Sequence, residues 1–149
     1  MPALPFDYAA ITRILPHRHP FLLVDRVVEF EADRRIVGIK AVSRDEPYLS
    51  RQGGEGFLPP TILMEAMAQV GAILVLTKPE HAHSLILFLG IQRARYRRPV
   101  RAGDVVRLEA EIDRLRGRMG RLRGAASVDG RVVADGVMSF ALGPREERG

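Results

Sequence analysis

The sequence predicts an α+β fold in which a curved antiparallel sheet wraps around one long central helix, and two observations carry this prediction. Residues 61–76 are apolar on nearly every face, which in a globular protein marks a helix enclosed by other structure. Much of the second half of the chain alternates apolar and polar residues with period two, most regularly over 104–115, as half-buried strands do. About six such strands with one helix to cover favour a single sheet that curls around the helix.

The first third of the chain contains a short helix and a hairpin. We expect a helix over 7–15, which ends before the prolines that follow it. Residues 21–31 and 35–43 read as paired strands joined by a turn at Asp33 and Arg34.

An irregular segment separates this hairpin from the central helix. Residues 44–60 are rich in glycine and proline, and loops of that length in small domains are often functional. The central helix is expected to end near Lys78 and Pro79, and residues 143–149 are expected to fray. Between them we expect strands that end in a tight hairpin turn at Asp129 and Gly130, over 84–92, 95–100, 104–115, 121–128 and 131–142.

Length and composition favour one globular domain over residues 1–149. The chain is 46% hydrophobic and 28% charged, so it can bury one good core. It contains no cysteine, which excludes disulfides, thiolate metal sites and a cysteine nucleophile. Residues 1–8 lack the basic and apolar regions of a signal peptide, and 61–76 are too few to span a bilayer, so we expect a cytoplasmic location.

The net charge of +5 comes almost wholly from arginine, and the densest cluster lies over 93–101. The cluster alternates like a strand, so we interpret it as one solvated basic face. A basic face attracts nucleic acid, membranes or acidic proteins, but no nucleic-acid motif and no tryptophan accompany it. We therefore expect neither a nucleic-acid nor a membrane partner. His81-x-His83 is a weak metal signal that is more typical of a surface loop, so no metal is expected.

Glu65 is a carboxylate within the apolar helix. An ionised carboxylate is costly to bury without partners, and acids in such places cluster at functional sites. Gln69, one turn further on the same face, offers a purely structural pairing instead. The residues alone leave both readings open.

Three blocks of the sequence resemble one family. Residues 15–27, 65–69 and 90–100, with Gly103-Asp104 behind the last, are similar to the signatures of the (3R)-hydroxyacyl-acyl carrier protein dehydratases of bacterial fatty-acid synthesis, which have the hot-dog fold. The resemblance implies that a histidine takes or returns the proton α to a thioester carbonyl while a helix carboxylate, matched by Glu65, handles the leaving hydroxyl. It implies no cofactor, and a site shared between two subunits, hence at least a homodimer, with the family's hexamer left open.

The loop before the helix departs from this family. The position of the family histidine is occupied by Arg51 when counted back from Glu65, or by Ser50 when counted forward from Glu46. The glycine whose N–H would polarise the carbonyl aligns with Pro60, which has no N–H to donate, although the amide of Thr61 would partly replace it. Base and oxyanion donor are therefore both missing from their usual places.

Other residues of the chain are poor candidates to replace the missing base. His17 has a counterpart in the family and is interpreted as a structural loop histidine, and His19 is interpreted as a packing residue. Glu55 lies in the altered loop, where a solvated glutamate is a poor base.

Three hypotheses of function follow. The first is a dehydratase of 3-hydroxyacyl thioesters, carried by acyl carrier protein or coenzyme A. The second is a non-catalytic acyl-binding or partner subunit of a heteromeric dehydratase, and the third is a hot-dog thioesterase. For the first we expect Gln69 and Thr61 at the substrate, and an acyl tunnel lined by Phe57, Leu58, Ile62 and Phe88. An acidic carrier would dock on Arg95, Arg97, Arg98 and Arg101.

Overall fold

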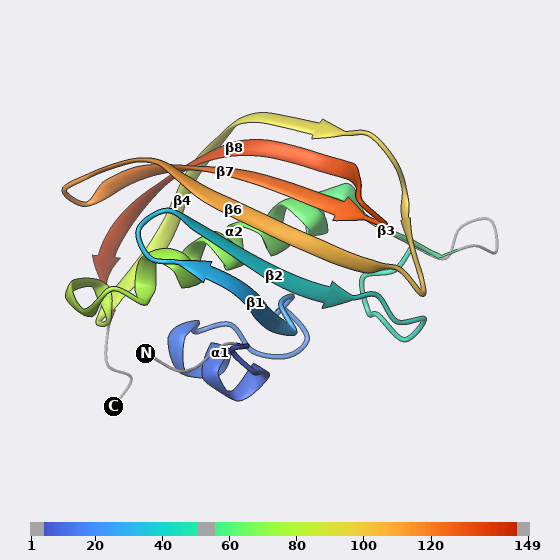
Figure 1. Cartoon of the computed structure of the whole chain (residues 1–149), viewed down its shortest axis with the longest axis horizontal. Coiled ribbons are helices and arrows are strands. Elements are labelled where there is room, and N and C mark those ends of the chain that lie inside the picture. The colour runs from blue at the N-terminus through green and yellow to red at the C-terminus, as the bar shows by residue number, and fades with distance from the viewer. Residues whose placement is uncertain (1–4, 51–55, 146–149) are drawn as a thin grey trace.

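The main sheet has six antiparallel strands and curves around the long helix α2 (Pro60–Leu76), as expected (Figure 1). The computed structural model describes residues 5–50 and 56–145. In spatial order the strands are β1 (Arg26–Glu31), β2 (Arg35–Ala41), β6 (Val105–Arg116), β7 (Met119–Val128), β8 (Arg131–Pro144) and β4 (Ser84–Tyr96). This is the hot-dog arrangement that the family resemblance implied.

Three short elements complete the fold. A two-stranded sheet pairs β3 (Phe57–Leu58) with β5 (Val100–Arg101), next to the first turn of α2. Helix α1 (Tyr8–Ile14) begins at the N-cap Asp7, whose carboxylate accepts from the amide of Ala10, and the 3₁₀ helix η1 (Pro79–His81) follows α2. Among the described helices, none combines the length and the apolar character needed to span a bilayer.

Helix α2 is enclosed because its apolar residues face the sheet and the N-terminal segment. From Ala66 to Leu76 every residue is buried, and the helix packs most extensively against β6 and β7. Close approach requires a glycine at one point, since a Cβ on Gly71 would lie 2.4 Å from the Cδ1 atom of Leu122. The core therefore forms between one helix and the concave face of one sheet.

The predicted turns are confirmed. Asp129 and Gly130 adopt positive φ angles of 50° and 76° between β7 and β8, as a tight hairpin requires. Asp33, with φ of 65°, turns the chain between β1 and β2.

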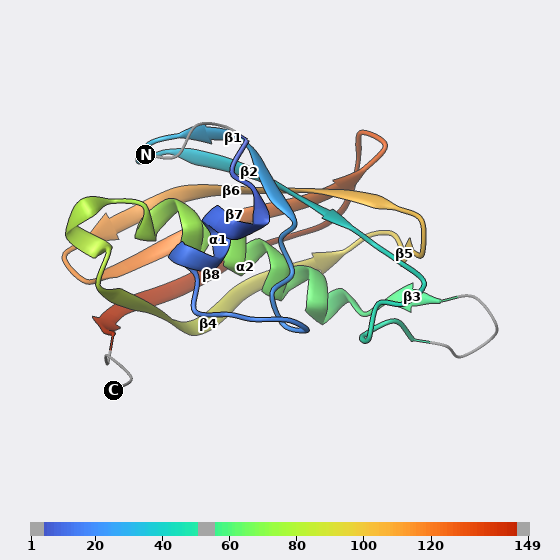
Figure 2. The ribbon, with the colours of Figure 1, turned by 90° about the horizontal axis from the view of Figure 1, so that it is seen from below.

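Most strand boundaries shift by one or two residues, and two strands differ more from the prediction. Residues 21–25 are not in a strand: β1 begins only at Arg26, and the preceding segment crosses over α2 and bonds to it instead (Figure 2). The strand expected over 84–92 continues to Tyr96 as β4, with register shifts beside Gly90 and Arg93. The separate strand expected over 95–100 is not found, because its first two residues belong to β4 and Val100 begins β5.

The end of the chain is more ordered than predicted. Gly143 and Pro144 belong to β8, and the amide of Arg145 donates to the carbonyl of His83 at 3.1 Å. The prediction of a frayed tail is wrong for these residues because pairing with β4 extends further than the alternating pattern showed. Residues 146–149 lie outside the described residues.

Strand β4 forms one edge of the main sheet. In the described chain it pairs with β8 alone and leaves its other side unpaired. Its exposed residues include the large apolar side chains of Leu87, Phe88, Leu89, Ile91 and Tyr96. A long apolar edge of this kind is suited to association with another chain.

Candidate active site

Gln69 on α2 forms hydrogen bonds both to Glu65 on the same helix and to the backbone of the N-terminal segment. Its side chain is 1% exposed, and its amide nitrogen donates to the Phe21 carbonyl at 2.7 Å and to Oε1 of Glu65 at 3.0 Å. Its amide oxygen accepts from the Leu23 amide at 2.8 Å. These bonds explain why residues 21–25 cross the helix rather than join the sheet, and they include the Gln69–Glu65 pairing that the sequence left open.

Glu65 is less buried than the sequence predicted. Its side chain is 29% exposed, because it lies in the second turn of α2, before the helix becomes fully enclosed. Both contacts found for the carboxylate in the described structure involve Oε1, and none is found for Oε2 there. The expectation that Glu65 is deeply buried is therefore wrong. The carboxylate is held by Gln69 and remains partly open to solvent.

His17 is the histidine that the fold brings to Glu65. Its Nε2 lies 3.6 Å from Oε1 of Glu65, and its side chain is also 29% exposed. Burial of the ring lowers the pKa of the His17 imidazole, against the opposing effect of Glu65 and with a smaller lowering by Arg18. Its Nδ1 is buried without a hydrogen-bond partner among the described residues.

Sequence reasoning missed this contact. His17 and Glu65 lie 48 positions apart, and interpretation of the histidine as merely structural overlooked that its loop crosses α2. The chemical signal was present, since a histidine and a helix carboxylate were both singled out, but only the fold brings them together.

The altered loop is only partly described. Ser50 and Phe57 exchange backbone hydrogen bonds of 2.7 and 3.1 Å, so the backbone of Ser50 holds the loop closed. Arg51 and Glu55 lie outside the described residues. Pro60 is the first residue of α2 and Thr61 is the second, with an exposed side chain.

The residues expected along an acyl tunnel differ in burial. Leu58 is buried, Phe57 and Ile62 are half-buried, and Phe88 is 40% exposed on β4. The ring of Phe88 meets the buried Phe140 with centroids 6.4 Å apart.

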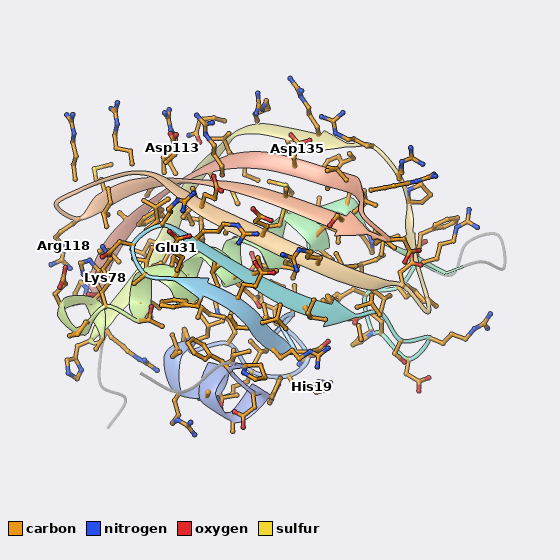
Figure 3. The ribbon with its side chains drawn as sticks, in the orientation of Figure 1. His19, Glu31, Lys78, Asp113, Arg118 and Asp135 are labelled. Carbon is orange, nitrogen blue, oxygen red and sulfur yellow. The ribbon has the colours of Figure 1, made fainter. Side chains whose placement is uncertain are left out.

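The expected basic surface is partly engaged within the chain. Arg97 donates from Nε to Asp135 at 2.8 Å, and the Arg101 guanidinium lies over the ring of Phe57, 5.2 Å from its centroid. Arg95 and Arg98 are exposed. Asp135 and Asp113 lie on the outer face of the sheet among many long side chains that project away from it (Figure 3).

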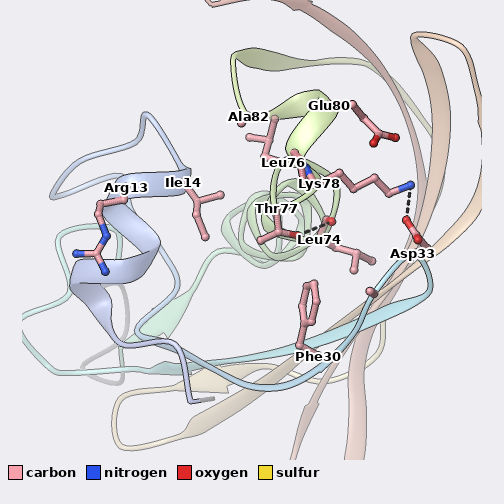
Figure 4. A pocket seen from close by; sticks show the side chains of 12 residues that line it. Arg13, Ile14, Phe30, Asp33, Leu74, Leu76, Thr77, Lys78, Glu80 and Ala82 are labelled. Carbon is pink, nitrogen blue, oxygen red and sulfur yellow. Dashed lines mark hydrogen bonds and ion pairs between the residues drawn. The ribbon is translucent and has the colours of Figure 1, made fainter. Parts of the chain in front are cut away.

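A cavity of about 580 Å³ lies at the opposite end of α2 from Glu65 (Figure 4). Ile14, Phe30 and Leu74 line it, and Lys78 forms an ion pair with Asp33 at its rim. Leu74 lies nine positions after Glu65 on the helix, a rise of roughly 14 Å. None of the residues predicted to bind substrate lines this cavity.

A metal centre has no support in residues 5–50 and 56–145. No group of three or more histidine, aspartate or glutamate side chains in these ranges is placed to hold an ion. Proton transfer between Glu65 and a neighbouring group is the chemistry that the described side chains offer.

Comparison with known proteins identifies the family. A model of the FabA-like domain matches residues 15–137, which is most of the chain. The chain belongs to the FabA-like family. The 3-hydroxyacyl-acyl-carrier-protein dehydratase FabZ of Moorella thermoacetica is 51% identical over 142 residues, covering 95% of this chain and 99% of that protein. FabZ of Pelotomaculum thermopropionicum is 48% identical over 139 residues, covering 91% of this chain and 98% of the relative.

A solved structure agrees with this assignment. The dehydratase heterocomplex ApeI:P from Xenorhabdus doucetiae matches with a TM-score of 0.80 and 25% identity, covering 97% of this chain and 94% of that chain. The hot-dog fold and the family resemblance are confirmed. The interpretation as an enzyme of the hydro-lyase type is confirmed as well, because the FabA-like relatives are named as dehydratases.

Proposed function

We propose that this chain interconverts 3-hydroxyacyl and trans-2-enoyl thioesters, with Glu65 handling the proton of the leaving or entering water. One observation carries the proposal: a carboxylate that is held by the buried Gln69 and is 29% exposed lies directly beside an imidazole. Elimination of water needs an acid at one carbon and a base at the next, and two groups in different environments can divide these roles.

Thr61 is the proposed donor to the thioester carbonyl. The first turn of a helix leaves backbone N–H groups without intrahelical partners, and their partial positive charge stabilises a developing oxyanion. Pro60 has no N–H, so the amide of Thr61 is the first one that α2 offers. Phe57, Leu58, Ile62 and Phe88 are proposed to contact the acyl chain.

The proposed substrate carrier is acyl carrier protein or coenzyme A. Arg95, Arg97, Arg98 and Arg101 are proposed to attract the acidic carrier, with a salt-sensitive rate of association. A cytoplasmic location and a single domain over 1–149 are part of the same proposal, which requires no cofactor.

We further propose a homodimer formed through β4, with a hexamer left open. The unpaired edge and its apolar side chains support this, since two copies of the strand can pair about a twofold axis. Light scattering at working concentration tests it: a mass of two chains or more is expected, and a monomer would exclude it.

A second candidate is a partner subunit of a heteromeric dehydratase. The similarity to a chain of the ApeI:P heterocomplex favours it, as does the absence of histidine at both candidate positions for the family base, Ser50 and Arg51. In this case another hot-dog chain would pair with β4 and supply the loop histidine that this chain lacks.

One assay separates these functions and the thioesterase alternative. Absorbance of an enoyl thioester reports hydration and free thiol reports hydrolysis, each measured for the wild type and for Glu65→Gln. We expect hydration by the wild type that falls about 10²–10⁴-fold in Glu65→Gln. Thiol release that depends on Glu65 would instead indicate a thioesterase, and binding of an acyl carrier without either reaction would indicate the partner subunit.

A further inference from the structure

The proposed dehydratase needs a base that the altered loop does not obviously supply. Of the four histidines in the chain, His17 is the one that contacts Glu65, whereas His19 is exposed and makes no such contact in the described structure. A neutral imidazole is the commonest general base in proteins, because its ordinary pKa lies near the working pH.

The geometry of the pair suits an elimination across two adjacent carbons. The separation of 3.6 Å between Nε2 of His17 and Oε1 of Glu65 is too long for a good hydrogen bond. The two groups are therefore neighbours, and each can still form a hydrogen bond to a substrate. Each side chain is also open to solvent over 29% of its surface. A substrate placed against this opening would present its α and β carbons to the two groups at once.

No hydrogen bond from the described residues determines whether Nδ1 of His17 carries a proton. The buried Nδ1 has no partner in the described part of the chain, and buried polar atoms without partners are uncommon enough to need a reason. The ring is positioned by its tilted contact with Phe21, at 6.0 Å between centroids, and by the loop itself. The carbonyl of Phe21 is in turn bonded to Gln69, so the same glutamine positions both members of the pair.

We infer that His17, from this chain's own N-terminal loop, is the second proton-transfer group of the site and acts at the α carbon while Glu65 acts at the β oxygen. This inference rests on the proposed dehydratase function. It replaces the loop histidine of the family with a residue on a different segment.

The proposed step balances in protons and electrons. Nε2 of neutral His17 takes the α proton, the C–H electron pair forms the double bond, and the C–O bond breaks as protonated Glu65 gives its proton to the departing hydroxyl. Water leaves, and the pair is now imidazolium and carboxylate. Solvent reaches both side chains, so the imidazolium gives its proton to water and the carboxylate takes one back, which restores the starting state, and hydration follows the same steps in reverse.

The charges around the ring are consistent with this role. Glu65 faces it from α2, Arg18 adjoins it on its own loop, and the Phe21 ring is uncharged. Burial lowers the pKa of His17, which favours the neutral base near pH 7. Glu65 opposes that shift, so removing its charge is expected to lower the pKa of His17 further.

The kinetic test compares two histidines of one loop. We expect His17→Gln to lower kcat for hydration of an enoyl thioester by about 10²–10⁴-fold with little change in KM, and His19→Gln to leave kcat within a few fold of the wild type. Circular dichroism melts check that both variants fold. A His17→Gln protein with wild-type kcat overturns the inference, and if Glu65→Gln is still inactive the dehydratase function survives that result. A wild type without hydration activity refutes the function and the inference together.

A titration without substrate gives an independent readout, because it also works on a protein with low activity. The His17 resonances, assigned by their absence from His17→Gln, are followed by NMR against pH in the wild type and in Glu65→Gln. We expect a pKa below 6.5 in the wild type and a lower one in Glu65→Gln, since the carboxylate favours the protonated ring. Equal pKa values in the two proteins would show that the groups are not coupled and would overturn the inference.

Discussion

The two ends of α2 belong to one helix but offer different chemistry. At the first end, Glu65 is held by Gln69 beside His17, and the crossing N-terminal segment supplies backbone partners for the buried amide. At the second end, Leu74 borders a cavity of about 580 Å³ whose charged lining residues are Arg13, Asp33, Lys78 and Glu80, and of these Lys78 pairs with Asp33.

This difference teaches that the size of a cavity does not locate the chemistry. The cavity at the second end has charged residues in its lining, Arg13, Asp33, Lys78 and Glu80, of which Lys78 and Asp33 pair with each other, but no histidine is among the residues that line it. The first end brings a histidine and a carboxylate to within 3.6 Å of each other. We therefore expect substitutions at the second end to change stability and substitutions at the first end to change turnover.

The largest expected effect on stability is at the second end. Leu74→Ala removes a fully buried side chain and enlarges the cavity, so the free energy of unfolding should fall by about 2–5 kcal/mol. Urea denaturation measures it. Turnover per folded molecule should be unchanged, and a loss of turnover in the folded fraction would break the distinction between the two ends.

Gln69→Leu should affect both properties, because Gln69 joins the site to the core. The substitution leaves the Leu23 amide and the Phe21 carbonyl without their described partner, so the free energy of unfolding should fall by about 1–3 kcal/mol. Glu65 also loses the bond that fixes Oε1, so kcat should fall as well. Thr77→Val, which removes one side-chain bond to the Leu74 carbonyl at the other end, is the matched control and should leave kcat unchanged.

The smallest effect is expected for the ion pair at the cavity rim. Lys78→Met removes a pair whose acid, Asp33, is mostly exposed, so the free energy of unfolding should change by less than about 1 kcal/mol. A thermal melt at low and high salt measures this. A larger loss of stability that persists in high salt would show that the Lys78–Asp33 pair contributes more than an ordinary surface ion pair.

Local patterns predicted the frame of the fold well. The apolar run of α2 and the Asp129-Gly130 turn depend on neighbouring residues alone, so the sequence contains all that is needed to find them. The single strand β4 was divided wrongly because its irregularities at Gly90 and Arg93 interrupt the alternation without ending the pairing.

Only the residues of the candidate site that lie on α2 could be predicted from the sequence. Glu65 and Gln69 lie one turn apart, so helix geometry offered their bond as one of the two readings that the sequence left open. The bond from Leu23 to Gln69 spans 46 positions, and the contact of His17 with Glu65 spans 48. Periodicity has no access to contacts of that range, so the partner of Glu65 became apparent only in three dimensions.

The most direct measurement compares the turnover of Glu65→Gln and Leu74→Ala on one enoyl thioester, per folded molecule and at a temperature where both are folded. We predict a loss of at least about 10²-fold for Glu65→Gln and none for Leu74→Ala. Equal turnover in the two variants, or a loss confined to Leu74→Ala, would contradict the assignment of the reaction to the first end of α2.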